Sequence, residues 1–223
     1  VADIRIDGAG KKVTRSDNCR VSDLSVSSDN LTFTYEAKSL PYPIDTSYYD
    51  NEKHTQADAL SVIPFMDEMN YEGLSVSGLS DGYYGLTIGG EFIGRFTARE
   101  LERGINMALL QNTPQYKQAM KIRQMNEERW LKERKMREFY WVEYNLMRKT
   151  GMLWACNEAA VDTLRKYRPH DIFLQWNGDL WLQYMHKGIR EDCVNEQQDL
   201  VNRIYEQNKP IPLRIEIKKF TDL

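Results

Sequence analysis

The sequence predicts an α+β protein, with an N-terminal antiparallel β-sandwich in residues 1–96 and a helical domain in residues 97–223. Two observations predict the sandwich: an alternating apolar pattern at residues 31–38, and a pair of glycines flanked by apolar residues at 89–90. A third observation predicts the helical domain, because the apolar period changes from two to 3.6 at Thr97.

The first hairpin is predicted at residues 21–38. Leu31, Phe33, Tyr35 and Ala37 alternate with polar residues, so one face of this strand is expected to be buried and the other wet. Residues 27–30 are a polar turn cluster, and the apolar residues before them supply the partner strand.

The second hairpin is predicted around Gly89 and Gly90, because two glycines accept the positive φ angles of a tight turn. Residues 86–88 and 91–93 are its strands, and residues 74–76 form a strand before it. Between the two hairpins, residues 40–59 contain Pro41 and Pro43, which predict a long excursion rather than a strand.

The helical domain begins with a predicted capping box at Thr97 and Glu100, followed by an apolar stripe that extends to Leu109. Thr113 and Pro114 then start a long helix, because threonine is a good N-cap and proline suits the first helical position. No glycine or proline follows before Gly151, so the helix is predicted over residues 114–149.

Shorter elements complete the helical domain. Helices are predicted at residues 157–167 and 190–207, and the alternation at 213–217 suggests a C-terminal strand.

The composition excludes several classes of protein. The net charge of −3, with acidic residues interleaved among the basic ones, argues against a nucleic-acid partner. No stretch reaches the ~20 apolar residues of a membrane span. Residues 1–7 start at Val1 and already resemble a strand, so we expect a trimmed or mature piece of a longer polypeptide.

The sequence contains few residues in the patterns that catalysis, metal binding or cofactor binding requires. The three histidines and three cysteines lack the spacing of a metal site, and no phosphate loop suggests a cofactor. Cys19, Cys156 and Cys193 are expected to be small buried residues, although a Cys156–Cys193 bridge stays open. An enzyme with its own site would use His170 and Asp171.

One aromatic stretch, residues 170–184, is a candidate ligand surface. Aromatic rings beside amide and carboxylate groups suit a sugar or another polar ligand, while packing between helices or docking of another domain explains the same rings. The candidate ligand-binding residues are Trp176, Asn177, Asp179, Trp181 and Tyr184.

Several ordered motifs resemble the C-terminal region of a bacterial group of SGNH/GDSL hydrolases. The resemblance rests on residues 1–7, 74–79, 82–90, 96–109, 113–115 and 126–129. Members of that family carry a Gly-Asp-Ser nucleophile block and an Asp-x-x-His block in an α/β domain. Neither block occurs in this sequence, so no catalytic residue is carried over.

The resemblance implies an accessory region of a serine ester hydrolase, an acylhydrolase or esterase whose expected substrate classes include acylated carbohydrate. Its implied partner is an upstream catalytic domain of the same protein, with homo-oligomerisation as a further expectation. It also implies a periplasmic or secreted protein. The alternative interpretation is a carbohydrate-binding or protein-interaction module with no catalytic role.

Overall fold

The computed structural model describes residues 1–46 and 53–220, and it divides into two compact units. The first unit contains Val1–Arg123 and Gln207–Leu223, and the second contains Gln124–Glu206. The sequence had suggested a division at residue 97. The units divide elsewhere because Ala98, Leu101 and Met107 belong to the hydrophobic core of the strands.

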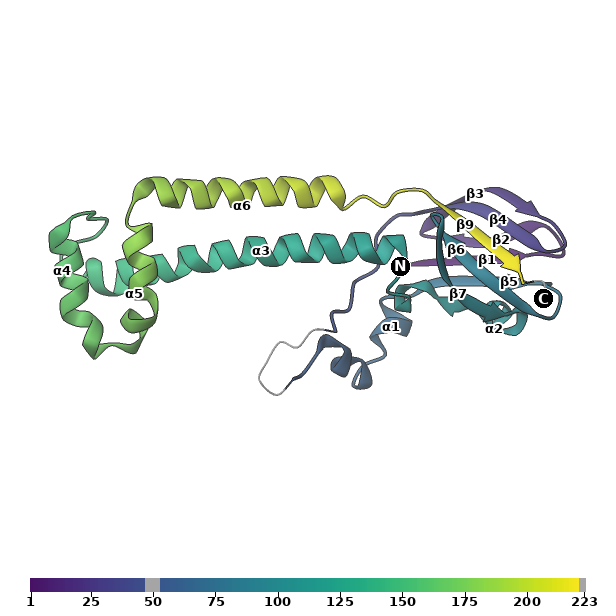
Figure 1. Cartoon of the computed structure of the whole chain (residues 1–223), viewed down its shortest axis with the longest axis horizontal. Helices are drawn as coiled ribbons and strands as arrows, with labels where there is room; N and C mark the ends of the chain where they lie inside the picture. The colour runs from purple at the N-terminus through teal and green to yellow at the C-terminus, as the bar shows by residue number, and fades with distance from the viewer. Residues whose placement is uncertain (47–52, 221–223) are drawn as a thin grey trace. The chain divides into compact units, whose positions relative to one another are not determined.

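Two sheets form the first unit, and together they make the predicted sandwich (Figure 1). One has the order β2-β1-β5-β8, from β1 (Ala2–Asp7), β2 (Lys12–Asp17), β5 (Glu72–Ser77) and β8 (Ile105–Asn106). The other has the order β3-β4-β9-β6-β7, from β3 (Cys19–Val26), β4 (Asn30–Ala37), β6 (Tyr83–Ile88), β7 (Glu91–Thr97) and β9 (Leu213–Lys219).

Strand pairing is antiparallel as predicted, except between β1 and β5. These two strands run parallel, with Ala2 opposite Glu72 and Ile6 opposite Val76. The strand predicted at residues 213–217 is β9, and it pairs with β4 on one side and β6 on the other. The strands therefore bring together segments that lie far apart in the sequence.

The core of the first unit lies between the two sheets. Leu31, Phe33 and Tyr35 of β4 are buried, which confirms the predicted alternation. Ile215 and Ile217 of β9 are fully buried beside them. Burial of such side chains is the main favourable contribution to stability, at about 1.5–3 kcal/mol each.

Both predicted hairpins are present. β3 pairs with β4, and β6 pairs with β7. Gly89 and Gly90 have φ angles of 58° and 84°, the positive values for which a glycine pair was predicted. The segment between the hairpins contains a short 3-10 helix (Gln56–Ser61) and α1 (Phe65–Glu68), and residues 47–52 of the predicted excursion lie outside the described residues.

The capping box at Thr97 is confirmed, but the helix it starts is short. The Glu100 backbone N–H donates to Thr97 Oγ1 at 3.1 Å, and the Thr97 N–H donates to Glu100 Oε2 at 2.7 Å. α2 (Ala98–Arg103) ends at Gly104, whose φ of 94° is incompatible with a continuing helix. The prediction of a helical stripe to Leu109 was wrong, since residues 105–106 pair as β8.

The long helix begins as predicted and changes geometry before its end. α3 (Pro114–Val142) starts after Thr113, whose Oγ1 accepts from the Tyr116 N–H at 3.3 Å. Residues Glu143–Met147 then form a π-helical segment. The chain turns after it, and Gly151 has a φ of 76°.

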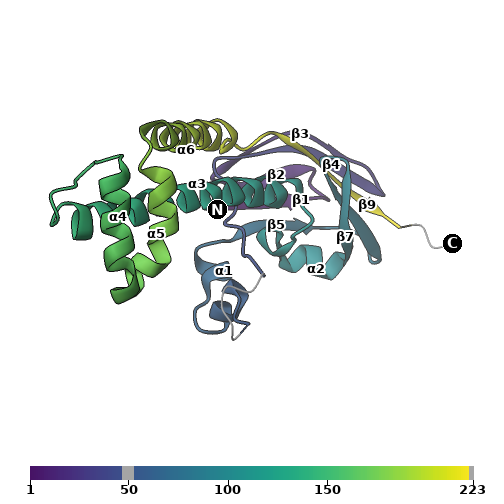
Figure 2. The ribbon, with the colours of Figure 1, turned by 60° about the vertical axis from the view of Figure 1, so that its left-hand side comes forward.

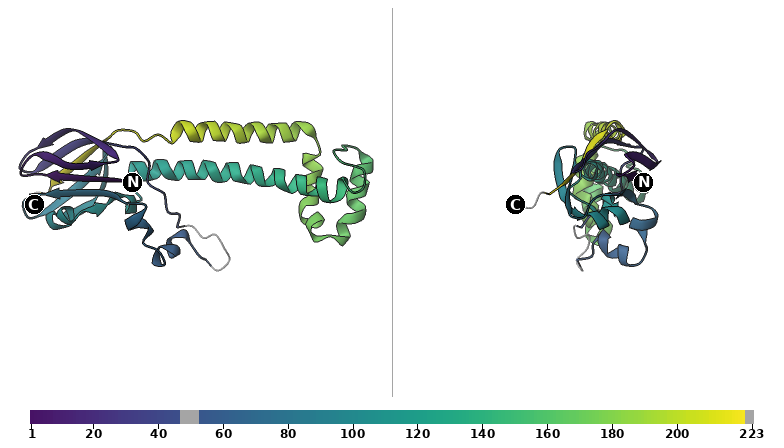
Figure 3. Two further views of the ribbon diagram at one scale, coloured as in Figure 1. Left: turned by 180° about the vertical axis from the view of Figure 1, so that it is seen from behind. Right: turned by 90° about the vertical axis from the view of Figure 1, so that its right-hand side faces the viewer.

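The second unit contains the last part of α3 and three more helices, which are α4 (Glu158–Tyr167), α5 (Ile172–Tyr184) and α6 (Lys187–Gln207). Within this unit α6 runs beside α3 (Figure 3), and Lys132 Nζ lies 2.6 Å from Glu196 Oε2. Side chains from all four helices form its core, including Phe139, Leu164, Trp181 and Cys193. No described helix is long and apolar enough to span a bilayer.

Candidate ligand-binding site

A pocket of about 420 Å³ lies in the helical unit, where the π-helical segment meets the corner between α4 and α5. Figure 2 shows α4 and α5 side by side at this corner. The pocket is lined by Trp141, Asn145, Leu146, Lys149, Thr150, Tyr167, His170, Asp171 and Leu174. Single-turn π segments often occur at functional sites, because they displace side chains from the regular helical positions.

The apolar part of the pocket is anchored in the core. Leu146 and Leu174 are buried there. The half-buried Trp141 ring packs on Phe173, with the ring centroids 5.2 Å apart and the planes tilted by 39°. Tyr167 is exposed at the end of α4. The pocket therefore has one ring fixed by packing and one ring facing solvent.

Local hydrogen bonds orient several polar groups of the pocket. The Asn145 side-chain amide donates to the Trp141 carbonyl at 2.9 Å, and its oxygen accepts no hydrogen bond from the described residues. Thr150 Oγ1 donates to the Leu146 carbonyl at 3.0 Å. Asp171 caps α5, where its Oδ1 accepts from the backbone N–H groups of Phe173 and Leu174 at 2.8 and 3.2 Å.

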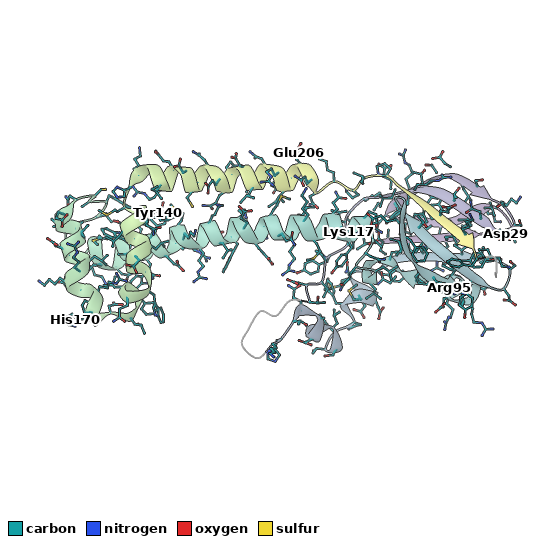
Figure 4. All side chains as sticks on the ribbon, in the orientation of Figure 1. Asp29, Arg95, Lys117, Tyr140, His170 and Glu206 are labelled. Carbon is teal, nitrogen blue, oxygen red and sulfur yellow. The ribbon has the colours of Figure 1, made fainter. Side chains whose placement is uncertain are left out.

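Two basic side chains line the pocket without polar partners among the described residues. The Lys149 ammonium and the His170 imidazole make neither a hydrogen bond nor an ion pair there. His170 follows α4 in the short 3-10 segment Arg168–His170 and is exposed (Figure 4). These two groups are available to an incoming molecule.

A buried carboxylate holds the surrounding segments in place. Glu143 accepts from Trp181 Nε1 at 2.8 Å through one oxygen, and from the Trp154 backbone N–H at 2.8 Å through the other. Trp154 has a φ of 60°, a conformation that costs energy for a bulky side chain. Glu143 thus ties the loop after α3 to the core of the unit.

The five candidate residues of α5 do not converge on one site. Trp181 is fully buried, and Tyr184 is largely buried, with its pKa raised to about 12 by burial and by a hydrogen bond with Cys193. Trp176 is 65% exposed and packs edge-on against Phe173 at 5.5 Å. Asn177 is half-buried, and its i, i+4 and i+7 spacing with Trp181 and Tyr184 places it on their side of the helix.

The fifth candidate, Asp179, is engaged by an arginine. Arg168 donates to both of its oxygens at 2.6 and 2.8 Å, and this guanidinium holds the Asp179 pKa below its ordinary value. Gly178 leaves room for the pairing, since a Cβ there would make a tight contact of 3.2 Å with Arg168 Nε. The pair supports the corner between α4 and α5.

His170 and Asp171, the residues expected in an independent enzyme site, do line the pocket. Asp171 is occupied as a helix cap. The pocket residues Trp141, Asn145 and Lys149 were missed in the sequence. Their i, i+4 spacing, which places them on one helical face, was the available signal.

The cysteines add no metal site. All three thiols are free, so the Cys156–Cys193 bridge is not formed. Cys193 is buried as expected, whereas Cys156 is exposed, with its Sγ 3.4 Å from His186 Nδ1. In residues 1–46 and 53–220, no group of three or more His, Cys, Asp or Glu side chains is placed to hold a metal ion.

Comparison with known proteins shows that the helical unit resembles a domain of a hydrolase. Residues 120–209 match the family model described as the diltiazem deacetylase C-terminal helical domain. The solved structure of a gut microbial diltiazem-metabolizing enzyme matches 99% of this chain with a TM-score of 0.92 and 35% sequence identity. The match covers 50% of that enzyme, so the chain spans about half its length. No curated protein gives a significant match.

Proposed function

We propose that this chain is the accessory C-terminal region of an ester hydrolase whose catalytic domain lies elsewhere in the same polypeptide. The observation that carries the proposal is the TM-score of 0.92, at 35% identity, to one half of a diltiazem-metabolizing enzyme. The family match points the same way, because a deacetylase cleaves an acetyl group and residues 120–209 resemble its C-terminal helical domain.

The finer assignment, an SGNH/GDSL hydrolase, is part of this proposal and rests on the sequence motifs. In such an enzyme a serine, a histidine and an acidic residue act together on the ester carbonyl. The sequence contains neither the Gly-Asp-Ser nor the Asp-x-x-His block. The chain would then contribute binding and positioning, by packing on the catalytic domain or shaping its substrate cleft.

Activity and active-site labelling test this proposal. The 223-residue chain is incubated with p-nitrophenyl acetate and diltiazem, and separately with a fluorophosphonate probe that labels activated serines. We expect neither serine labelling nor serine-dependent turnover, while a longer polypeptide that includes a Gly-Asp-Ser domain shows both.

One control removes an ambiguity from the assay. The exposed Cys156 thiol beside His186 can hydrolyse an activated ester slowly without any serine. The Cys156→Ser variant is therefore assayed in parallel. Fluorophosphonate labelling of any serine within the chain would contradict the proposal.

A carbohydrate-binding role is the second candidate, and the pocket at the end of α3 favours it. This role does not compete with the first, since an accessory region of an ester hydrolase can hold the sugar part of an acylated substrate.

A further inference from the structure

The lining of the pocket in the helical unit restricts the class of ligand that it can bind. Its walls combine the rings of Trp141 and Tyr167 with a buried floor from Leu146 and Leu174. A volume of about 420 Å³ falls within the ~300–1,000 Å³ that small-molecule sites commonly occupy.

The hydrogen-bonding groups around the pocket include both donors and acceptors. Lys149 and the Tyr167 hydroxyl can donate, and His170 can donate or accept. The free oxygen of Asn145 accepts, and so does the Asp171 oxygen that does not cap α5. A ligand that satisfies this set must itself carry several donors and acceptors.

The charge of the pocket is balanced. Lys149 supplies one positive charge and Asp171 one negative charge, and His170 adds an imidazole to the lining. A phosphate or carboxylate site needs an excess of cations, and an amine site needs an excess of anions. The lining therefore favours an uncharged polar ligand.

Aromatic walls select among uncharged polar ligands. A flat ring offers a complementary surface to a molecule with an apolar face, and its edges leave room for polar groups. A pyranose ring combines C–H groups on its faces with hydroxyl groups around its rim. We propose that this pocket binds a neutral sugar ring, with Trp141 as the stacking platform.

The platform and its polar neighbours are positioned before any ligand arrives. Trp141 packs on Phe173, and its carbonyl holds the side chain of Asn145. Asp171 is fixed by two backbone N–H groups at the start of α5. A site that is already ordered loses little conformational entropy on binding.

Saturation-transfer NMR and amide chemical-shift titration test the proposal with defined probes. The neutral probes are methyl β-D-glucopyranoside and cellobiose, and the charged probes are glucuronate, glucosamine and inorganic phosphate. We expect cellobiose to shift amides of residues 141–150 and 167–174, and we expect the charged probes to bind no more tightly.

Variants of the helical unit distinguish a loss of stacking on the ligand from a general loss of folded structure. Trp141→Ala is expected to weaken cellobiose binding about tenfold, in line with ~1.4 kcal/mol for one aromatic contact. The matched control is Trp130→Ala, because Trp130 is a 45% exposed tryptophan on the same helix outside the pocket. It should leave binding unchanged.

A second pair of variants keeps the test valid if Trp141→Ala loosens the fold. Asn145→Leu and His170→Leu remove polar groups from exposed side chains, and each should weaken cellobiose binding about threefold to tenfold, the effect of one hydrogen bond. Equal binding by wild type and these variants would overturn the proposal, as would preferential binding of phosphate, glucuronate or glucosamine.

The test of sugar binding and the test of the proposed hydrolase role can fail independently of each other. The NMR titration measures the pocket without any ester, whereas fluorophosphonate labelling measures catalysis without any sugar. A sugar-binding chain that also carried an activated serine would contradict only the proposed function.

Discussion

At the scale of single residues, burial changes the pKa of a glutamate in the first unit. Glu72 is fully buried in the first unit, where Tyr35 donates to its Oε1 at 2.8 Å and Gln115 donates to its Oε2 at 3.3 Å. Burial raises the pKa of Glu72 against the opposing effect of these hydrogen bonds. The alternation of β4 predicted a buried Tyr35, but no local pattern in the sequence predicted a buried glutamate as its partner.

Stability should depend on pH through Glu72. A raised pKa in the folded state favours the neutral acid, so its contribution is greatest below the ordinary glutamate pKa and is lost as pH rises through the raised value. Glu72→Gln removes this ionisation and still accepts from Tyr35. We expect the Tm of the variant to exceed that of wild type by an amount that grows between pH 5 and pH 8, where calorimetry measures it.

A constant difference across this pH range would show that Glu72 does not titrate as argued. The added amide also has a partner to find, because Gln115 Oε1 is a buried acceptor without a hydrogen bond among the described residues. Rotation of either amide would allow one to donate to the other.

The three cysteines should differ in reactivity. Burial and the nearby carboxylates raise the pKa of Cys19 to about 11, and Cys193 is buried. Cys156 is exposed beside His186. Iodoacetamide at pH 7.5 should therefore alkylate Cys156 at least about tenfold faster than the other two, as measured by peptide mass spectrometry. Comparable rates for Cys19 would refute this order.

At the scale of elements, the sequence predicted secondary structure best where one or two residues determine a backbone conformation. Thr97, Pro114 and the glycine pair at 89–90 lie where their chemistry predicted. The helix α5 was missed because its stretch contains tryptophans and a glycine that do not follow a simple apolar stripe. Gly178 accommodates a guanidinium from outside the helix, which only the folded structure reveals.

The end of α2 depends on the backbone freedom of Gly104. Its φ of 94° and ψ of 142° lie in a region that is essentially restricted to glycine. Gly104→Ala should lower the free energy of unfolding of the strand unit by about 1–3 kcal/mol, measured by urea titration.

Gly188 serves as the control, because its backbone conformation does not require glycine. Gly188 lies within α6, and nothing occupies the space where its Cβ would be. Gly188→Ala should stabilise the helical unit by up to about 1 kcal/mol. Similar destabilisation by both substitutions would argue against the backbone explanation.

For the whole molecule, the sequence predicted the fold class and the strand at residue 213, but it did not predict the partners of that strand. Ile217 lies opposite Leu31 on one side and Leu86 on the other. Such long-range pairing, like the parallel pairing of β1 with β5, depends on the twist and packing of complete sheets. The candidate ligand residues stay a prediction, and the pocket lies elsewhere because it joins side chains from separate helices.

Substitution in β9 should affect one unit selectively. Ile217→Ala leaves a cavity in the sandwich and should cost about 2–5 kcal/mol. Hydrogen exchange should show lost protection in residues 1–123 while protection in 124–206 is retained. The adjacent exposed Lys218→Ala is the control, and uniform loss of protection across both units would contradict the prediction.

The central place of β9 imposes an order on biosynthesis. As the polypeptide leaves the ribosome, strands β4 and β6 must wait for a neighbour that is translated only after the whole 124–206 segment. Until then each presents an unpaired edge, a surface that invites association with other nascent chains. Prompt collapse of the intervening helices would shorten the distance that β9 has to search.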